Sequence, residues 1–189
     1  MSDPLSGEDR QTLLKLAREA MSAAVRGERM PHLNLEGLPP QLRKVESSFV
    51  TLTIKGALRG CIGALEPSMP LAEDVRQHVV AAALQDYRFQ PVRADEVPVI
   101  NIEISRLTLA QPLSYSSPED LISKLRVGVD GVILTDGYRR ATFLPQVWEK
   151  LPDPVDFLDH LCQKMGAQAD LWRRKPMQVY VYQVEEFHE

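Results

Sequence analysis

Three short turns that contain glycine constrain most strongly how this chain can fold. They are Lys55-Gly56, Asp130-Gly131 and Asp136-Gly137. Dipeptides of this kind form the two-residue loops of β-hairpins, because glycine readily adopts the positive φ that these loops need. We therefore expect residues 47–55 and 57–61, which flank the first turn, to pair as antiparallel strands. Residues 127–143 are expected to form a three-stranded meander around the two aspartate-glycine turns.

Amphipathic helical segments separate the expected hairpins. Residues 6–26 place apolar side chains at helical spacing, and Ser6 with Asp9 forms the pattern of a capping box. Isoleucine alternates with polar residues between positions 99 and 107, which predicts a strand with one core-facing side. A final strand is expected over residues 177–184. Further helices are expected over residues 68–85, from Ser117, from Pro145 and over residues 153–165.

The order of these elements indicates the fold class. Hairpins and helices mix without a regular strand–helix alternation. The sequence therefore favours an α+β fold whose sheets are mixed but largely antiparallel, with flanking helices. The length of 189 residues fits a single domain over residues 1–189. A chain of this size buries a sizeable core without disulfides or a structural metal.

Charge and hydropathy exclude several classes of protein. Lys and Arg total 22 and Asp and Glu total 26, which gives a net charge of −4 and argues against a nucleic-acid-binding protein. No apolar run approaches the roughly 18–20 residues that span a bilayer, so no membrane partner is expected. The polar N-terminus lacks a signal-peptide core, which predicts a cytoplasmic protein. Cys61 and Cys162 are then expected to be reduced thiols.

The most unusual short segment is LRGCIG at residues 58–63. A glycine inside a strand marks a bulge, a bend or a close backbone approach. On a regular strand Arg59 and Cys61 point to the same side, and a nearby guanidinium favours the nucleophilic thiolate. One interpretation is that Cys61 is a reactive thiol. The other is that Cys61 is a small buried residue in a tightly packed strand, since free cysteines are often buried.

Two further segments contain candidate site residues. In DYRFQP at residues 86–91, Asp86 and Arg88 are expected to pair, either in a binding site or as a clamp on buried backbone groups. Glu103 lies on the polar side of the strand at 99–107, where a carboxylate acts as a general base, binds a cation, is solvated or pairs with an arginine such as Arg106. Cys162 lies among apolar residues at helical spacing and is interpreted as a core residue.

The chain carries no established motif for a metal or a cofactor. It has no phosphate-binding loop ending in Gly-Lys-Ser/Thr, no GxGxxG, no CxxC and no HExxH. Its four histidines are far apart in sequence. We therefore expect neither a metal nor a cofactor. The basic run at residues 173–175 is expected to be a solvated surface patch.

Five segments, taken in order, carry a family resemblance. They are LRGCIG at 58–63, DYRFQP at 86–91, IEIS at 102–105, GVDGV at 128–132 and ATFLPQVW at 141–148. Together they resemble the Alport syndrome, mental retardation, midface hypoplasia and elliptocytosis candidate-gene domain family. Prokaryotic members of that family are called AmmeMemoRadiSam system protein A. The resemblance extends over nearly the whole chain.

The resemblance implies a larger α+β lobe that holds both termini, a smaller lobe and a cleft between them. It also implies two partners, a Memo-like protein and a radical SAM protein, to which the name of the system refers. Combined with the residue patterns, it gives two sets of site residues. The candidate catalytic residues are Cys61, Glu103 and Asp86. The candidate ligand-binding residues are Arg59, Gly60, Gly63, Arg88 and Thr142.

Two functions of different classes remain open. The first is a component of the modification system that supplies a binding cleft and a reactive thiol at Cys61, with Asp86 or Glu103 as its proton partner and arginines holding an anionic group. The second is a non-enzymatic adaptor that binds a protein partner, with LRGCIG structural and an exposed patch near Trp148 or Trp172 as the contact. Nucleic-acid binding is disfavoured by the acidic balance and the 6% of aromatic residues.

Overall fold

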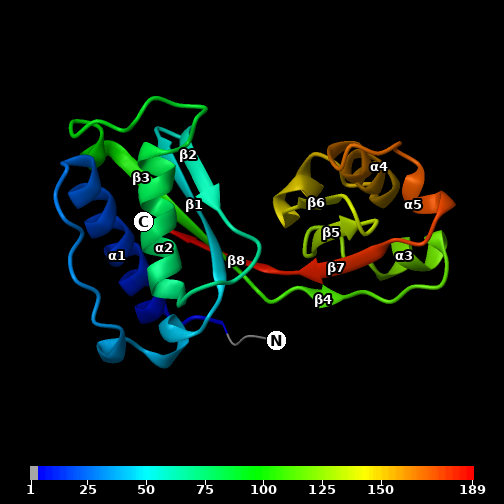
Figure 1. Ribbon diagram of the computed structural model, residues 1–189, viewed down its shortest axis with the longest axis horizontal. Helices are drawn as coiled ribbons and strands as arrows, with labels where there is room; N and C mark the ends of the chain where they lie inside the picture. Colours follow the sequence, from blue (N-terminus) through cyan, green and yellow to red (C-terminus); the bar gives the residue numbers. More distant parts are fainter. Residues whose placement is uncertain (1–3) are drawn as a thin grey trace. The chain divides into compact units, whose positions relative to one another are not determined.

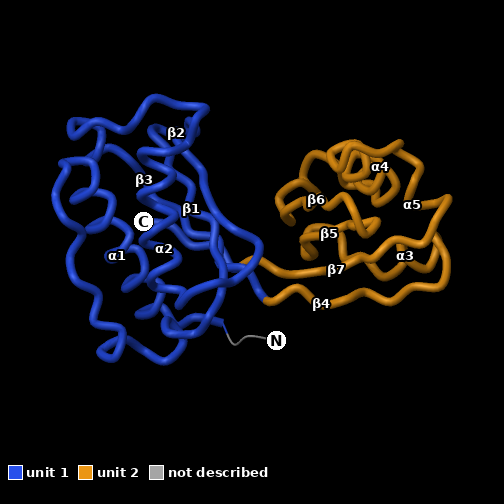
Figure 2. Tube along the Cα trace, viewed as in Figure 1, with its two compact units in different colours: residues 1–108, 185–189 blue, residues 109–184 orange. Residues whose placement is uncertain are grey.

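The computed structural model describes residues 4–189, and the chain divides into two compact units (Figure 2). Unit 1 contains the described residues up to Thr108 together with Glu185–Glu189, and unit 2 contains Leu109–Val184. Each unit is built around its own four-stranded sheet and its own hydrophobic core. The expected α+β fold is confirmed, as is the larger lobe in which the described chain begins and ends.

In unit 1 the sheet has the strand order β2-β1-β3-β8, and helices α1 and α2 lie side by side over one of its faces (Figure 1). β1 pairs antiparallel with both β2 and β3. The strands are β1 at Ser47–Ile54, β2 at Ala57–Gly63, β3 at Ile100–Leu107 and β8 at Val184–His188. The helices are α1 at Gly7–Val25 and α2 at Leu71–Leu84, with 3-10 turns at Leu35–Gly37, Pro40–Arg43 and Val97–Val99.

The local patterns of unit 1 form as expected. The Ser6 Oγ accepts a hydrogen bond from the Asp9 N–H at 3.1 Å, and the Asp9 carboxylate accepts one from the Ser6 N–H, which completes the capping box of α1. Lys55 and Gly56 both have positive φ, 51° and 80°, as the tight turn between β1 and β2 requires.

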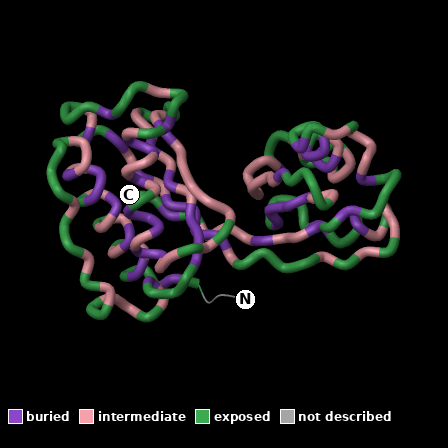
Figure 3. Tube along the Cα trace, viewed as in Figure 1, coloured by how far each residue is buried: buried purple, intermediate pink, exposed green. Residues whose placement is uncertain are grey.

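In unit 2 the strand order is β4-β7-β5-β6, and every pair is antiparallel. Its core contains three aromatic residues, since the rings of Trp148 and Phe157 stack with centroids 3.6 Å apart and Trp172 is buried in the same cluster. Figure 3 shows buried stretches in the helices and strands of both units, while most loops are exposed.

The strands of unit 2 are β4 at Gln111–Pro112, β5 at Gly131–Thr135, β6 at Arg140–Phe143 and β7 at Gln178–Tyr182. The helices are α3 at Pro118–Lys124, α4 at Pro154–Lys164 and α5 at Leu171–Arg174, with a 3-10 helix at Pro145–Glu149. Among the helices of residues 4–189, none has the length and apolar character needed to cross a membrane.

Two expected strand patterns were wrong. Residues 127–143 contain two strands instead of three, because the segment before β5 forms a turn. In this turn the Asp130 carboxylate accepts a hydrogen bond from the Arg126 N–H at 3.0 Å. The backbone carbonyl of Asp130 accepts one from the Trp148 indole N–H at 2.7 Å. Asp130-Gly131 is therefore the end of a loop and not a hairpin turn. The expected strand over 177–184 is two strands, β7 in the sheet of unit 2 and β8 in the sheet of unit 1.

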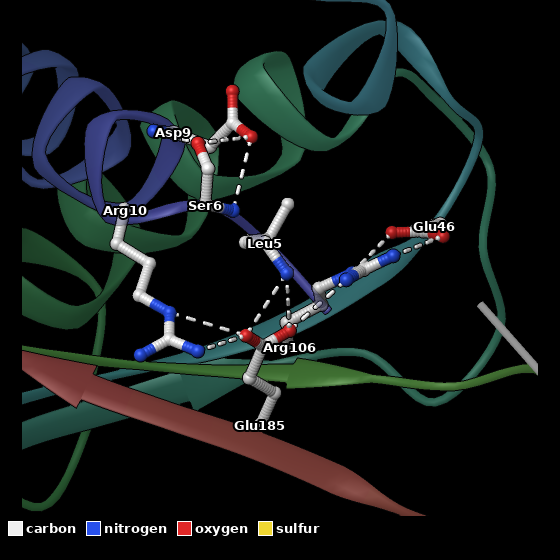
Figure 4. A network of polar contacts seen from close by, with 7 residues as sticks. All are labelled: Leu5, Ser6, Asp9, Arg10, Glu46, Arg106 and Glu185. Carbon is white, nitrogen blue, oxygen red and sulfur yellow. Dashed lines mark hydrogen bonds and ion pairs between the residues drawn. The ribbon is translucent and has the colours of Figure 1, made fainter. Parts of the chain in front are cut away.

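A network of ion pairs in unit 1 fixes the segments through which the chain leaves this unit and returns to it (Figure 4). Arg106 precedes the departure by two residues and is 3% exposed. Its guanidinium binds Glu46 at 2.5 and 2.8 Å and Glu185, the first residue after the return, at 3.0 Å. Glu185 also accepts from the Leu5 N–H and the Arg10 guanidinium. These partners compensate the charge of Arg106, which is costly to bury alone.

Candidate functional site

Arg59 is the extra residue of a β-bulge in β2. The pairing register between β1 and β2 shifts by one residue at this point. The Arg59 guanidinium binds the Glu96 carboxylate at 2.8 and 3.0 Å and the backbone carbonyls of residues 90 and 91. Through its hydrogen bonds it keeps the pKa of Glu96 below the ordinary value. The regular alternation that would align Arg59 with Cys61 therefore does not apply, and Arg59 holds the loop after α2.

Asp86 and Arg88 cover the edge of β2 at Cys61, in the place that a further strand would take. The Cys61 N–H donates to Asp86 Oδ2 at 2.9 Å, and the Cys61 carbonyl accepts from Arg88 Nη2 at 3.1 Å. The expected pair of Asp86 and Arg88 is present, at 2.6 and 2.9 Å. The bonds from Arg88, and then from the Cys61 N–H, hold the pKa of the buried Asp86 well below its usual range. The pair therefore clamps backbone groups of β2, and no hydrogen bond joins Asp86 to the thiol.

Gly60 and Gly63 stand where a side chain would collide with neighbouring atoms. A Cβ at Gly60 would lie 2.2 Å from the carbonyl oxygen of Ala82, so glycine at this position allows β2 to approach α2 closely. A Cβ at Gly63 would lie 2.3 Å from the ring of Phe49. Both glycines of the LRGCIG segment thus have a packing role.

Cys61, Thr51 and Glu103 form a row across β2, β1 and β3. Thr51 lies opposite Cys61 on one side and opposite Glu103 on the other, and its hydroxyl donates a hydrogen bond to the Cys61 Sγ at 3.4 Å. Residues that alternate with this row, such as Leu52 and Ile102, are fully buried with α1 and α2. The row therefore lies on the opposite face of the sheet, where all three residues are half-buried. We call the surface formed by Cys61, Thr51 and Glu103 the open sheet face.

Glu103 is the carboxylate of the open sheet face. Its carboxylate has no hydrogen bond or ion pair with any residue from 4 to 189. Of the alternatives, the pair with Arg106 is not formed, because Arg106 is an odd number of residues away on β3 and its side chain binds Glu46 and Glu185 on the other side of the sheet.

Thr142 belongs to β6, and its contacts lie within unit 2. Its hydroxyl donates to the Val132 carbonyl at 2.9 Å and lies 2.9 Å from the Tyr182 Oη. Burial raises the pKa of Tyr182 to about 12. A Cβ at Gly131 would lie 2.4 Å from the Tyr182 ring. The segments at 128–132 and 141–148 are thus tied together by packing and hydrogen bonds around Tyr182.

The two cysteines occupy different environments, and neither is in a disulfide. Cys61 is half-buried on the open sheet face, whereas Cys162 is fully buried in the core of unit 2, as expected. Burial raises the pKa of the Cys162 thiol. Within the described chain, no three His, Cys, Asp or Glu side chains gather closely enough to hold a metal ion.

Thr51 and Glu96 are the residues that the sequence did not single out. A regular hairpin around Lys55-Gly56 would place Thr51 opposite Gly60, and only the bulge at Arg59 moves it opposite Cys61. Glu96 reaches Arg59 because the loop after α2 returns to β2. Neither contact has a local sequence signal, since each depends on the path of the backbone.

Comparison with known proteins finds relatives that align with nearly the whole chain. A sequence model of the AMMECR1 protein family matches residues 14–187. A protein of Methanothermobacter thermautotrophicus is 41% identical over 187 residues, which cover 98% of this chain and 97% of that protein. A protein of Thermofilum pendens is 37% identical over 200 residues, covering 98% and 92%. The crystal structure of the uncharacterized protein PH0010 from Pyrococcus horikoshii is similar with a TM-score of 0.85 and 32% identity, covering 98% of this chain and 93% of that one.

Proposed function

This chain belongs to the AMMECR1 family, and from that premise we propose that it is the ligand-binding component of a modification system, with the open sheet face as its binding surface. The observation that carries the proposal is the row of Cys61, Thr51 and Glu103, in which a thiol, a hydroxyl and a carboxylate share one half-buried surface. The partners that act on the bound ligand are a Memo-like protein and a radical SAM protein.

Each residue of the row has its own role in this proposal. Cys61 is the nucleophile, and the Thr51 hydroxyl orients its sulfur. Neighbouring strands lie about 4.8 Å apart, so the backbones of Cys61 and Glu103 are separated by about 10 Å. A ligand lying over Thr51 spans that distance and presents an N–H or cationic group to the Glu103 carboxylate.

The motif residues around the row support it and do not bind the ligand. The three guanidinium nitrogens of Arg59 and the Nε and Nη2 of Arg88 are directed to carboxylates and backbone carbonyls of unit 1, which leaves an anionic ligand no pair of free arginines at the row. Asp86 is a positioning residue, because it holds the backbone of Cys61. In this proposal Arg59 and Arg88 stabilise the fold around the row, and they do not hold an anionic group as one sequence-based hypothesis suggested.

Alkylation of the two cysteines tests the proposal. We expect iodoacetamide to label Cys61 in the folded protein and Cys162 only after unfolding, because Cys162 is fully buried and its thiol has a raised pKa. Peptide mass spectrometry at several pH values gives the two rates separately. Thr51→Val, which keeps the shape and removes the hydroxyl, should change the rate at Cys61 and leave Cys162 unchanged. Labelling of both cysteines only after unfolding would exclude a reactive thiol.

A second candidate function, a non-enzymatic adaptor, is favoured by one exposed aromatic residue. Tyr87 stands between Asp86 and Arg88 in the clamp and is 94% exposed, and Leu58 in β2 is 45% exposed. Exposed tyrosines of this kind are frequent anchors of protein interfaces. In this function the thiol is dispensable and the clamp presents Tyr87 to the Memo-like partner.

Partner capture separates the two functions. The adaptor requires that binding of the Memo-like protein survives Cys61→Ser and is weakened about tenfold or more by Tyr87→Ala, as for an interface anchor. Tyr138→Ala is the matched control, since Tyr138 is 98% exposed but belongs to unit 2. Equal binding by all three variants would remove the adaptor hypothesis based on Tyr87.

A further inference from the structure

Unit 2 contains a small pocket that the proposed function does not use. The pocket has a volume of about 180 Å³ and lies between the residues that lead into α3 and the connection from α5 to β7. Tyr115 and Pro118 form one wall, and Trp172 and Pro176 form the other. The basic run of Arg173, Arg174 and Lys175 also lines it. The run expected to be a plain surface patch therefore borders a concave site.

Hydrogen bonds to other residues of unit 2 hold two of the residues that line the pocket in place. The Tyr115 hydroxyl accepts from the Met177 N–H at 2.7 Å and donates to the Met177 carbonyl at 3.0 Å, which joins the two segments. Trp172 is 1% exposed, and its indole N–H donates to Asp159 at 2.6 Å. The site is thus preformed, which lowers the entropic cost of binding a ligand.

The three cations keep donors that no other group of the described chain uses. Arg173 binds Asp159 through Nη2 only, and Arg174 binds Asp170 and Gln168 through Nη2 only. The Nε and Nη1 groups of both arginines make no hydrogen bond with residues 4–189, and the Lys175 ammonium has neither a hydrogen bond nor an ion pair there. These groups contrast with Arg59 of unit 1, whose Nε, Nη1 and Nη2 groups all bind the chain.

We propose that this pocket binds a small phosphate monoester. Three separate cations match a dianion with several acceptor oxygens better than a single carboxylate, which one arginine can satisfy. The proline and aromatic walls suit the short carbon stem of the ester. The volume of about 180 Å³ accommodates a phosphate group with a few carbon atoms. The pocket is independent of the open sheet face, because all its residues belong to unit 2.

Calorimetric titration of the full chain with glycerol 3-phosphate tests the proposal. We expect saturable binding that is weakened about tenfold by Lys175→Gln and further by adding Arg174→Gln, since each change removes a charge-assisted contact. Lys150→Gln, which removes an exposed lysine of unit 2 outside the pocket, should bind as the unchanged chain does. Circular dichroism checks that each variant is folded.

Three further ligands test which chemical group the pocket recognises. Inorganic phosphate should displace glycerol 3-phosphate, and succinate at equal concentration should do so at least tenfold less well. Absence of saturable binding would overturn the proposal. Equal weakening of binding by Lys150→Gln and Lys175→Gln would overturn it in favour of general charge attraction. A phosphoserine peptide that binds more than tenfold more tightly than glycerol 3-phosphate would overturn it in favour of a phosphorylated protein.

Discussion

Units 1 and 2 are both four-stranded sheets packed against helices, yet three arginines of unit 1 and the basic run of unit 2 use their donors differently. In unit 1 the arginines at positions 59, 88 and 106 are bound to carboxylates and backbone carbonyls of the same unit. In unit 2 the interior is held by stacked aromatic rings, and the basic run at 173–175 lies at the surface with donors unused. These three arginines of unit 1 thus join segments of that unit, whereas the basic run of unit 2 keeps donors unused.

This difference explains why the same kind of motif has different consequences. An arginine that stabilises a strand edge or compensates a buried carboxylate is unavailable for a ligand, however suggestive its position in the sequence. An arginine on a surface helix remains available, because its ion pair is weak and uses only part of its guanidinium. The two arginines closest to the LRGCIG segment therefore hold backbone and carboxylate groups of unit 1, whereas the basic run of unit 2 is exposed with donors unused.

The largest expected effect comes from the buried network of unit 1. Glu46→Ala leaves Arg106 buried without its bidentate partner and should lower the free energy of unfolding by about 3–5 kcal/mol. Asp170→Asn in unit 2 breaks an exposed pair with Arg174 and should cost about 1 kcal/mol or less. Urea unfolding followed by circular dichroism measures both. Similar losses in the two variants would contradict the contrast between the units.

Two glycines provide the next comparison. Gly60→Ala drives a methyl group against the backbone carbonyl of Ala82, which cannot move without shifting α2, and should cost about 1–3 kcal/mol. Gly131→Ala meets the buried ring of Tyr182, a side chain whose shift moves no helix backbone but strains its hydrogen bonds to Thr142 and Phe143, and should cost less. The same urea experiment ranks them. A larger loss for Gly131→Ala would mean that the packing of unit 2 is the more rigid of the two.

A smaller effect than that of Glu46→Ala is expected at Asp86, and it depends on pH. Asp86 has a pKa below its usual range, so its contribution is complete above about pH 4, the ordinary carboxyl pKa, and is lost as the pH falls further. Asp86→Asn should therefore cost about 1–2 kcal/mol at pH 7, a low value because Arg88 is half exposed. The difference from the unchanged chain should shrink below pH 4.

Two probes assign the acid effect to a unit. Both tryptophans lie in unit 2, so their fluorescence reports on that unit, whereas labelling of Cys61 reports on unit 1. Asp86→Asn should increase the labelling of Cys61 at neutral pH before it changes the fluorescence. An effect seen first in the fluorescence would argue against the clamp on β2.

The candidate site could be predicted only in part. The sequence identified Cys61, Asp86, Arg88 and Glu103, and it anticipated that Asp86 and Arg88 pair. It aligned Arg59 with Cys61 because a strand without a bulge alternates strictly. For Glu103 it left open a solvated carboxylate or a pair with an arginine such as Arg106, and Arg106 binds Glu46 and Glu185 instead. The pattern of a single strand shows neither a bulge nor the segments that pack against that strand.

What the sequence determined by itself is the local structure. The capping box at Ser6, the helix starts at Ser117 and Asp153 and the turn at Lys55-Gly56 formed as their patterns indicate. Each of these features depends on backbone groups within about four residues, so the information lies within one short segment.

Only the tertiary structure decided which segments meet. It placed the end of the chain against β3, split the last expected strand between two sheets and aligned Cys61 with Thr51 and Glu103. It also directed the arginines of unit 1 to their carboxylates. A periodic pattern specifies which face of a strand is buried, but the partner of that strand depends on the packing of distant segments around one core.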